Sequence, residues 1–127
     1  MTYHVCPNPI LNTEKIEKPW GYEIIWAHNK NAGYVSKILF IEAGKKTSKQ
    51  FHKIKEETIY VLSGILTLII SKDDTECFYF LKKGESFHIE ANLVHRFYAE
   101  FVDVELVETS TDYLEDVVRI EDEYGRC

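Results

Sequence analysis

The chain has 127 residues, of which 45% are hydrophobic and 28% charged, and its formal net charge is −6. A chain of this length favours one domain with a substantial core, and the acidic balance argues against proteins that bind nucleic acid or an anionic membrane. Its three cysteines are too far apart for a disulfide framework, and no segment resembles a signal peptide or a transmembrane helix, so we expect a cytoplasmic protein.

The order of elements along the chain indicates one all-β domain, residues 1–127. Residues 1–19 contain all three prolines and are predicted to form an irregular arm. From residue 20 to residue 110, short runs of β-branched and aromatic residues alternate with breaks that carry Gly, Asn, Asp or Lys, which predicts a β-sandwich or barrel. The predicted strands are 22–27, 34–42, 58–63, 65–71, 76–81, 86–90, 94–99 and 102–108.

The C-terminal tail, residues 111–127, has a different pattern. Thr111 or Asp112 can cap a short helical turn. The apolar side of that turn would consist of Leu114, Val117 and Val118. We therefore predict one short helical turn here, the only helix of note, because no amphipathic stretch elsewhere is long enough for another.

Four polar residues form a candidate metal site. In an extended strand, residues two apart face the same side, so Gln50 and His52 point the same way. Glu57 follows after a turn that can bring its carboxylate beside this pair, and His95 follows a later turn. Two imidazole nitrogens, one carboxylate and one amide oxygen suit Zn²⁺, Mn²⁺, Fe²⁺, Co²⁺ or Ni²⁺. Each residue alone is more often surface decoration, so the prediction depends on their ordered pattern.

That pattern resembles the first motif of the cupin superfamily, G(x)5HxH(x)3–4E(x)6G. Gly44 opens the motif, and Gln50 and His52 stand at its HxH positions. Glu57 and Gly64 follow at the spacing of the family. Gln at the first histidine position is the one departure from this motif.

The second cupin motif, G(x)5PxG(x)2H(x)3N, is matched less well. Gly84 opens it and His95 falls at its histidine. Glu90, Asn92 and Ala99 stand where the family usually has Pro, Gly and Asn. The change at Asn92 is mild because Asn tolerates a left-handed backbone, while the other two changes weaken the motif. Glu90 and Asn92, in the loop before His95, allow an altered substrate pocket.

Within the cupins, the chain resembles the cupin domain of mannose-6-phosphate isomerase, in the bifunctional type that also carries a mannose-1-phosphate guanylyltransferase. In that group the first ligand position is Gln, so Gln50 agrees with the pattern. The resemblance covers about residues 18–126. The segments that carry it are "PWG", "GYVSKILFIEAG", the Q-x-H and E before an "LSG" turn, "VHR" and "EDVVRIEDEYGR".

This resemblance implies a cupin-type antiparallel β-barrel, or jelly roll, with a divalent metal ion inside. Zinc is expected first, with manganese, iron, cobalt or nickel as alternatives. The implied ligands are Gln50, His52, Glu57 and His95. The implied activity is the interconversion of an aldose phosphate and a ketose phosphate. The alternatives are a cupin epimerase or another enzyme that acts on an activated sugar such as a nucleotide sugar, and a sugar-binding cupin without turnover.

Two residues are candidates for proton transfer. Lys37 matches a lysine of the family and shares strand parity with Leu39, so it is expected to point inward, where it would bind an anion or act in catalysis; a surface lysine is the alternative. His88 is a candidate acid or base, although its alternation with Phe87 and Ile89 favours an ordinary outward-facing histidine.

Arg119 and Arg126 match the tail of the family. Either residue could bind the substrate's phosphate or hold the tail in place through ion pairs, and the structural role is slightly favoured. Arg119 is the candidate substrate-binding residue. Cupins often pair through their strand edges, so a homodimer is also expected, with the arm 1–19 able to swap onto the partner.

Overall fold

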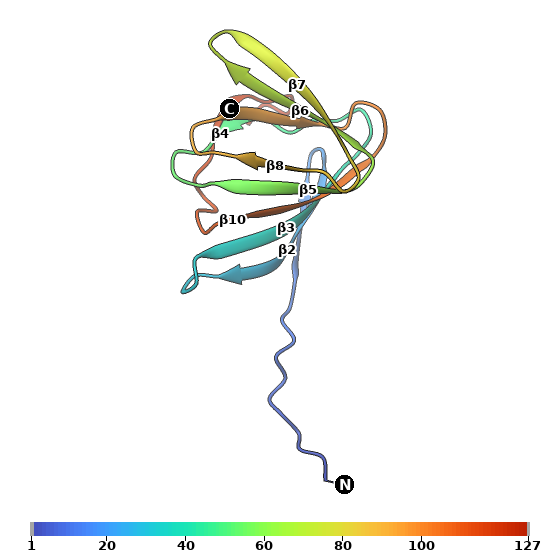
Figure 1. Cartoon of the computed structure of the whole chain (residues 1–127), viewed down its shortest axis with the longest axis vertical. Coiled ribbons are helices and arrows are strands. Elements are labelled where there is room, and N and C mark those ends of the chain that lie inside the picture. The colour runs from blue at the N-terminus through green and yellow to red at the C-terminus, as the bar shows by residue number, and fades with distance from the viewer. Residues whose placement is uncertain (1, 127) are drawn as a thin grey trace.

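The computed structural model describes residues 2–126, which form eleven strands and no helix. In this range there is accordingly no helix that is long and apolar enough to cross a membrane. The strands follow one another closely from β1 onward (Figure 1). Their bounds are β1 Glu14–Lys18, β2 Gly21–Asn29, β3 Tyr34–Ile41, β4 Lys49–Phe51, β5 Glu57–Ser63, β6 Ile65–Lys72, β7 Thr75–Lys82, β8 Ser86–Ile89, β9 Val94–Tyr98, β10 Val104–Thr111 and β11 Val118–Glu121.

The strands form two antiparallel sheets, with the orders β1-β2-β3-β10-β5-β8 and β11-β4-β9-β6-β7. Apolar side chains from both sheets meet in one buried cluster. Its most enclosed members include Ile41, Ile59, Leu66, Leu68, Val104 and Leu106. The all-β prediction is confirmed. The arrangement agrees with a cupin jelly roll that consists of two sheets, and not with a single closed barrel.

Strand alternation brings a carboxylate into this interior. In β5, the side chains of Glu57, Ile59 and Val61 are buried. Those of Thr58 and Tyr60, which alternate with them, are exposed. Because side chains two apart in a strand share a face, Glu57 enters the interior on the same side as the apolar core residues that follow it.

Two left-handed backbone positions shape the connections. Gly64 joins β5 in one sheet to β6 in the other with φ +81°, and a Cβ there would lie 2.2 Å from the carbonyl oxygen of Asp103. No residue larger than glycine fits that position without a shift of the backbone. Asn92 has φ 68°, so the interpretation that it replaces a left-handed glycine of the second motif is confirmed.

The predicted arm is wrong over residues 14–18. These residues form β1, which pairs antiparallel with β2 from Glu14 opposite Ile25 to Lys18 opposite Gly21. Four of the five residues of β1 are charged, so the strand lacks the apolar density on which the prediction relied. Residues 2–13, which precede β1, form no strand and extend away from the body of the domain (Figure 1).

The predicted C-terminal helical turn is also wrong. The segment after β10 runs through a turn at residues 114–115 into β11, which pairs with β4. Asp112 does not act as a helix cap, since its carboxylate lies 2.9 Å from the ring nitrogen Nε2 of His28. Hydrogen bonds to distant parts of the chain thus override the local helical pattern in this segment.

Candidate metal centre

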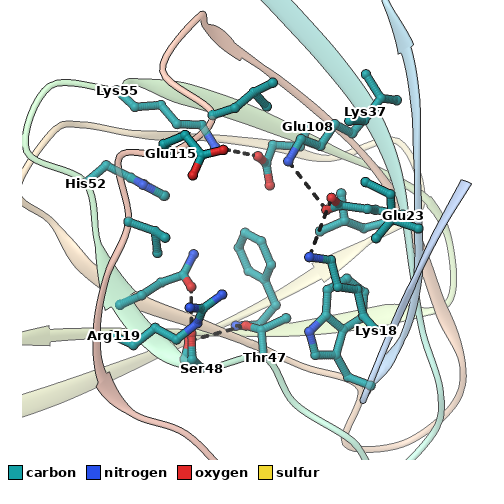
Figure 2. A pocket seen from close by; sticks show the side chains of 18 of the residues that line it. Lys18, Glu23, Lys37, Thr47, Ser48, His52, Lys55, Glu108, Glu115 and Arg119 are labelled. Atoms are coloured by element: carbon teal, nitrogen blue, oxygen red, sulfur yellow. Dashed lines mark hydrogen bonds and ion pairs between the residues drawn. The ribbon is translucent and has the colours of Figure 1, made fainter. Parts of the chain in front are cut away.

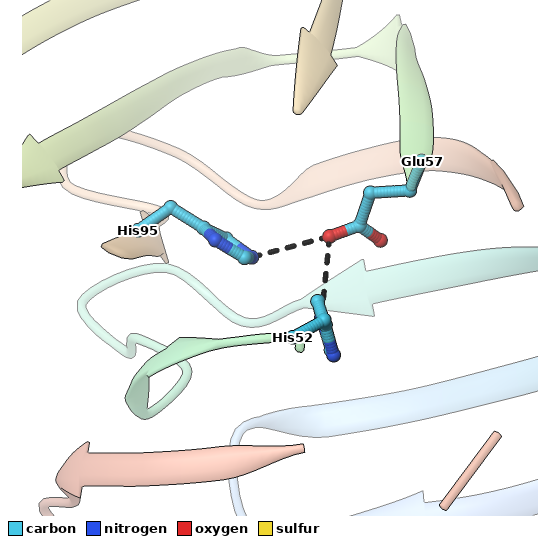
Figure 3. A group of neighbouring side chains, drawn as sticks. All are labelled: His52, Glu57 and His95. Atoms are coloured by element: carbon cyan, nitrogen blue, oxygen red, sulfur yellow. Dashed lines mark ion pairs between the residues drawn. The ribbon is translucent and has the colours of Figure 1, made fainter. Parts of the chain in front are cut away.

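Three side chains from three separate strand regions converge inside the domain (Figure 3). His52 follows β4, Glu57 begins β5 and His95 lies in β9. Oε1 of Glu57 lies 3.5 Å from Nε2 of His52 and 3.2 Å from Nε2 of His95. One ligand atom from each of the three residues lies within 4.8 Å of the other two, and all three side chains are buried. This separation is short enough for a single ion to bind all three.

The outer nitrogen of each imidazole is held by a backbone carbonyl. Nδ1–H of His95 donates to the carbonyl oxygen of Leu93 at 2.8 Å. Nδ1–H of His52 donates to the carbonyl oxygen of Asp116. With Nδ1 protonated, the neutral ring presents the lone pair of Nε2 toward Glu57. Such contacts to the outer nitrogen orient histidines that bind metal ions.

The inward-facing atoms at this centre lack hydrogen-bond partners. Nε2 of His52, Nε2 of His95 and both carboxylate oxygens of Glu57 are buried without one among residues 2–126. Buried polar atoms are rarely left this way because desolvation without a partner costs free energy. A divalent cation would satisfy all of them, and two histidines with one carboxylate form a donor set that leaves positions for water or substrate. The residues present therefore fit a metal ion.

Neighbouring groups at the centre shift the pKa values of Glu57 and His95. Burial raises the pKa of Glu57, but the adjacent imidazoles of His52 and His95 and the charge of Lys55 outweigh it, so the pKa lies well below its usual range. Burial lowers the pKa of His95, but the carboxylate of Glu57 outweighs it and the pKa is raised. Without a metal ion, protons therefore compete for the same lone pairs, and metal binding must displace them.

Gln50, the fourth expected ligand, lies beside this centre. It is in β4, directly opposite His95 of β9. Its Oε1 accepts a hydrogen bond from the hydroxyl of Ser48 at 2.6 Å, which fixes the direction of the amide. An amide oxygen has a second lone pair, so this hydrogen bond leaves Gln50 able to bind a cation.

A cavity of 490 Å³ adjoins His52 and Gln50 (Figure 2). Its walls combine apolar residues such as Trp20, Leu39 and Phe97 with many charged side chains. The charged residues that line it are Glu14, Lys18, Glu23, Lys37, Lys55, Glu108, Glu115, Arg119 and Arg126. Cationic and anionic groups in a concave site of this size suit a small polar ligand.

One buried ion pair connects the cavity wall to the metal centre. Nζ of Lys55 lies 2.9 Å from Oε1 of Glu108 and 3.6 Å from Oε2 of Glu57. Burial lowers the pKa of Lys55, but the two carboxylates outweigh it and raise the pKa above its ordinary value. Burial and the charge of Glu57 raise the pKa of Glu108, and the charge of Lys55 opposes this shift. Lys55 therefore separates two carboxylates that would otherwise repel each other.

A second charged group lies across the cavity from His52 (Figure 2). Nζ of Lys37 lies 3.4 Å from Oε2 of Glu23, and Nζ of Lys18 lies 3.7 Å from Oε1 of the same residue. The side chain of Lys37 is only 12% exposed, so the structure places it inside, as its strand parity predicts. Two cations share the carboxylate of Glu23 here.

The other predicted site residues fall in different places. Arg119 lines the cavity, and its buried Nε has no hydrogen-bond partner within the described range. Arg126 also lines the cavity, but it makes two hydrogen bonds to the carboxylate of Asp122, at 2.8 and 2.9 Å. His88 does not reach the cavity: its side chain is 53% exposed and contacts Glu56 at 3.2 Å. The structure therefore does not bring His88 together with the other candidates.

Sequence reasoning missed Glu23, Lys55, Glu108 and Asp116. A signal existed for Glu108, because it shares strand parity with the apolar residues Val104 and Leu106. Lys55 and Asp116 lie in irregular segments, where no periodicity indicates the direction of a side chain.

Comparison with known sequences identifies one family. The cupin domain family matches residues 38–109, more than half of the chain. No curated protein sequence matches the chain at a significant level. The family match covers the region that contains His52, Glu57 and His95.

Comparison with known structures shows the same fold at low sequence identity. CapF from Staphylococcus aureus, a capsular polysaccharide assembling protein, has a TM-score of 0.77 and 16% identity over 87% of this chain and 34% of that chain. Oxalate decarboxylase OxdC from Bacillus subtilis, which has Mn(II) centres, has a TM-score of 0.71 and 18% identity over 84% of this chain and 30% of that chain. KdgF from Halomonas sp. has a TM-score of 0.66 and 15% identity over 84% of this chain and 93% of that chain. The chain thus spans about a third of the length of CapF and OxdC.

Proposed function

The chain belongs to the cupin family, and on this premise we propose that it is a divalent-metal enzyme that interconverts an aldose phosphate and a ketose phosphate. This is the reaction of the mannose-6-phosphate isomerases, which its sequence resembles. One observation carries the proposal: the buried ligand atoms of His52, Glu57 and His95 lack hydrogen-bond partners among residues 2–126, and His52 also lines a cavity that contains both cationic and anionic side chains. A cavity of 490 Å³ is large enough for a hexose phosphate.

The metal ion would be held by His52, Glu57 and His95, with the amide oxygen of Gln50 as a fourth ligand. We propose zinc first, and the mixed nitrogen and oxygen donor set also suits manganese, iron, cobalt and nickel. When bound, the ion would stabilise the negative charge that develops on O1 and O2 of the sugar. The hydrogen bonds to Leu93 and Asp116 keep both imidazole rings oriented toward it.

The cationic walls of the cavity would hold the phosphate. Lys18 and Lys37 share one carboxylate, so their net positive charge attracts an anion to the wall opposite His52. Arg119 offers a buried N–H that lacks a partner in residues 2–126. Guanidinium groups bind phosphate through directed pairs of hydrogen bonds. Placing the phosphate by these cations would fix the position of C1 and C2 relative to the metal centre.

Proton transfer between C2 and C1 requires a base in the same cavity. Glu23 and Glu108 are buried carboxylates that line it. The carboxylate of Glu23 forms ion pairs with two lysines, whereas that of Glu108, within the described residues, forms an ion pair with Lys55 alone. We therefore assign the proton transfer to Glu108 and the anion-binding role to Lys37, whose amino group lies beside Glu23.

The proposal is tested by measuring metal content and turnover of the same preparation. The purified protein is analysed for bound metal and then incubated with mannose 6-phosphate, glucose 6-phosphate and fructose 6-phosphate in turn. Interconversion that disappears with the metal on chelation, and returns on its replacement, is the expected result. Bound metal without turnover of any sugar phosphate would rule out the isomerase while leaving the metal centre intact.

A negative result would be followed by two assays on the same sample. Exchange of solvent deuterium into a nucleotide sugar would indicate the epimerase alternative. Calorimetric binding of a sugar phosphate or nucleotide sugar without exchange would indicate a cupin that binds sugar and does not turn it over.

A further inference from the structure

The edge strand β7 differs from the other edges of the two sheets. The sheets end at β1, β8, β11 and β7. β1 is dominated by charge, and β8 and β11 have only four residues each. These are common ways in which a sheet edge is protected from pairing with another chain. β7 has eight residues, seven of them exposed, and its central sequence is Cys-Phe-Tyr-Phe-Leu.

The exposed surface of β7 is aromatic. Phe78 is 55% exposed, Tyr79 46% and Phe80 54%. Phe101 lies next to this strand, with its ring centroid 6.2 Å from that of Phe80, and is itself 56% exposed. Figure 1 shows the β6–β7 hairpin projecting at one end of the domain, where its outer edge is accessible. A long edge strand that carries such side chains is suited to pairing with a further strand.

The charges at the two ends of β7 indicate which strand it would pair with. Glu76 lies near the start of the strand and Lys82 at its end, and neither has an ion-pair partner within the described part of the chain. They share a face with Phe78 and Phe80, because all four positions differ by even numbers. If a second copy of β7 pairs antiparallel about Tyr79, each Glu76 lies opposite a Lys82 and each Phe78 lies opposite a Phe80.

We propose that β7 pairs with β7 of a second copy of this chain, antiparallel and with the two-fold axis at Tyr79. The two five-stranded sheets then form one continuous sheet across the dimer. Two oppositely charged cross-strand pairs and two aromatic pairs stabilise this register, while registers shifted by two residues lose these pairs. The interface is isologous, as a two-fold dimer requires. It does not depend on the metal centre or on the proposed reaction.

A charge exchange tests this pairing. Glu76→Lys and Lys82→Glu each place like charges opposite each other twice per dimer, and the double variant restores both opposite-charge pairs. We expect each single variant to raise the dimer dissociation constant by about tenfold and the double variant to recover most of the loss. The measurement is sedimentation or light scattering over a concentration series. Glu17→Lys on β1 is the matched control, because it makes the same charge change on another edge strand.

A cross-link tests the position of the axis. Tyr79→Cys is introduced after Cys6, Cys77 and Cys127 have been replaced by Ser. Residues that face each other across an antiparallel pair have Cα atoms about 4.5–5.5 Å apart, which a disulfide can span. Mild oxidation should therefore give a covalent dimer from Tyr79→Cys and none from Glu17→Cys in the same background.

Three results would overturn the proposal. The first is a wild-type protein that stays monomeric at the highest concentration that remains in solution. The second is a dimer whose dissociation constant is unchanged by both single charge variants, since it would use another surface. The third is a dimer that shows no disulfide at residue 79.

Discussion

The imidazole of His52 donates a hydrogen bond to the backbone carbonyl of Asp116, a residue 64 positions further along the chain. The carboxylate of Asp116 in turn accepts backbone N–H groups of Lys53, Ile54 and Lys55, at 3.2, 2.8 and 3.0 Å. One residue of the C-terminal segment therefore holds both the ring of a candidate ligand and the backbone that follows it.

We predict that Asp116→Ala weakens metal binding by about tenfold or more, because loss of the carboxylate releases the backbone N–H groups of residues 53–55, which hold the carbonyl of residue 116 beside His52. Asp116→Asn should lose less, since its amide oxygen still accepts hydrogen bonds from the backbone. The metal affinity is measured by competition with a chromogenic chelator. Asp112→Ala is the control, as Asp112 contacts His28 and not His52. Equal affinities for the Asp112 and Asp116 alanine variants would contradict the prediction.

Removing either histidine of the centre should remove the metal. We expect His52→Ala and His95→Ala each to reduce the bound metal strongly, because each deletes one of three converging ligand atoms. His88→Ala should retain the full metal content, since its exposed ring contacts Glu56 instead. Elemental analysis of the three purified variants gives the stoichiometry. Unchanged metal in either His52→Ala or His95→Ala would count against the site.

Arg119→Gln should weaken substrate binding without loss of the metal. If Arg119 holds the phosphate, its removal deletes charge-assisted hydrogen bonds and should raise KM by about tenfold or more with a smaller effect on kcat. Lys30→Gln removes one positive charge at an exposed position and serves as the control. The prediction fails if both variants change KM equally, because the effect would then come from net charge alone.

Gly64→Ala should lower the free energy of unfolding by about 2 kcal/mol or more, because it adds steric overlap to an unfavourable backbone angle. Its Cβ would lie 2.2 Å from the carbonyl oxygen of Asp103. Gly33→Ala separates the two effects: Gly33 also has a positive φ, +79°, but no atom lies within 4 Å of its Cβ position. Denaturant titration of both variants should show the larger loss at position 64.

Low pH should weaken the ion pair between Asp122 and Arg126. The hydrogen bonds and charge of Arg126 lower the pKa of Asp122 to about 2, from an ordinary value of 3.8. Because the folded-state pKa is depressed, the stabilisation is present above the unfolded-state value and is lost as the pH falls through the folded-state value. The difference in unfolding free energy between wild type and Asp122→Asn should therefore be largest above about pH 4 and shrink toward pH 2. A constant difference over this range would contradict the assignment.

The sequence predicted those parts of the fold and site that depend on alternation. Parity along a strand placed Lys37 inside, and motif spacing brought together His52, Glu57 and His95, as the structure does. Parity favoured the outward position of His88, which the structure shows. The predictions for Lys37 and His88 need only knowledge of which face of a strand a residue occupies, whereas the metal site also needs the spacing of the motifs.

Other features depend on contacts between distant segments, which local patterns do not reveal. β1 was read as part of an irregular arm because its charged residues lack a strand-like pattern, yet β2 supplies its hydrogen-bond partners. The helical turn after Thr111 was predicted from local caps, yet Asp112 and Asp116 bind His28 and the turn after His52 instead. Lys55 pairs with Glu108, 53 positions away, and no spacing rule indicates that contact.

The hydrogen bond from His52 to Asp116 also sets an order of events during synthesis of the protein. The other ligands, Glu57 and His95, precede Asp116 in the chain, so all three side chains leave the ribosome before the carbonyl that orients His52. A nascent chain that has exposed His95 but not Asp116 holds three donors with one ring free to rotate. We therefore expect the site to bind its ion at full affinity only after the C-terminal segment has paired with β4, because the carbonyl of Asp116 orients the ring of His52.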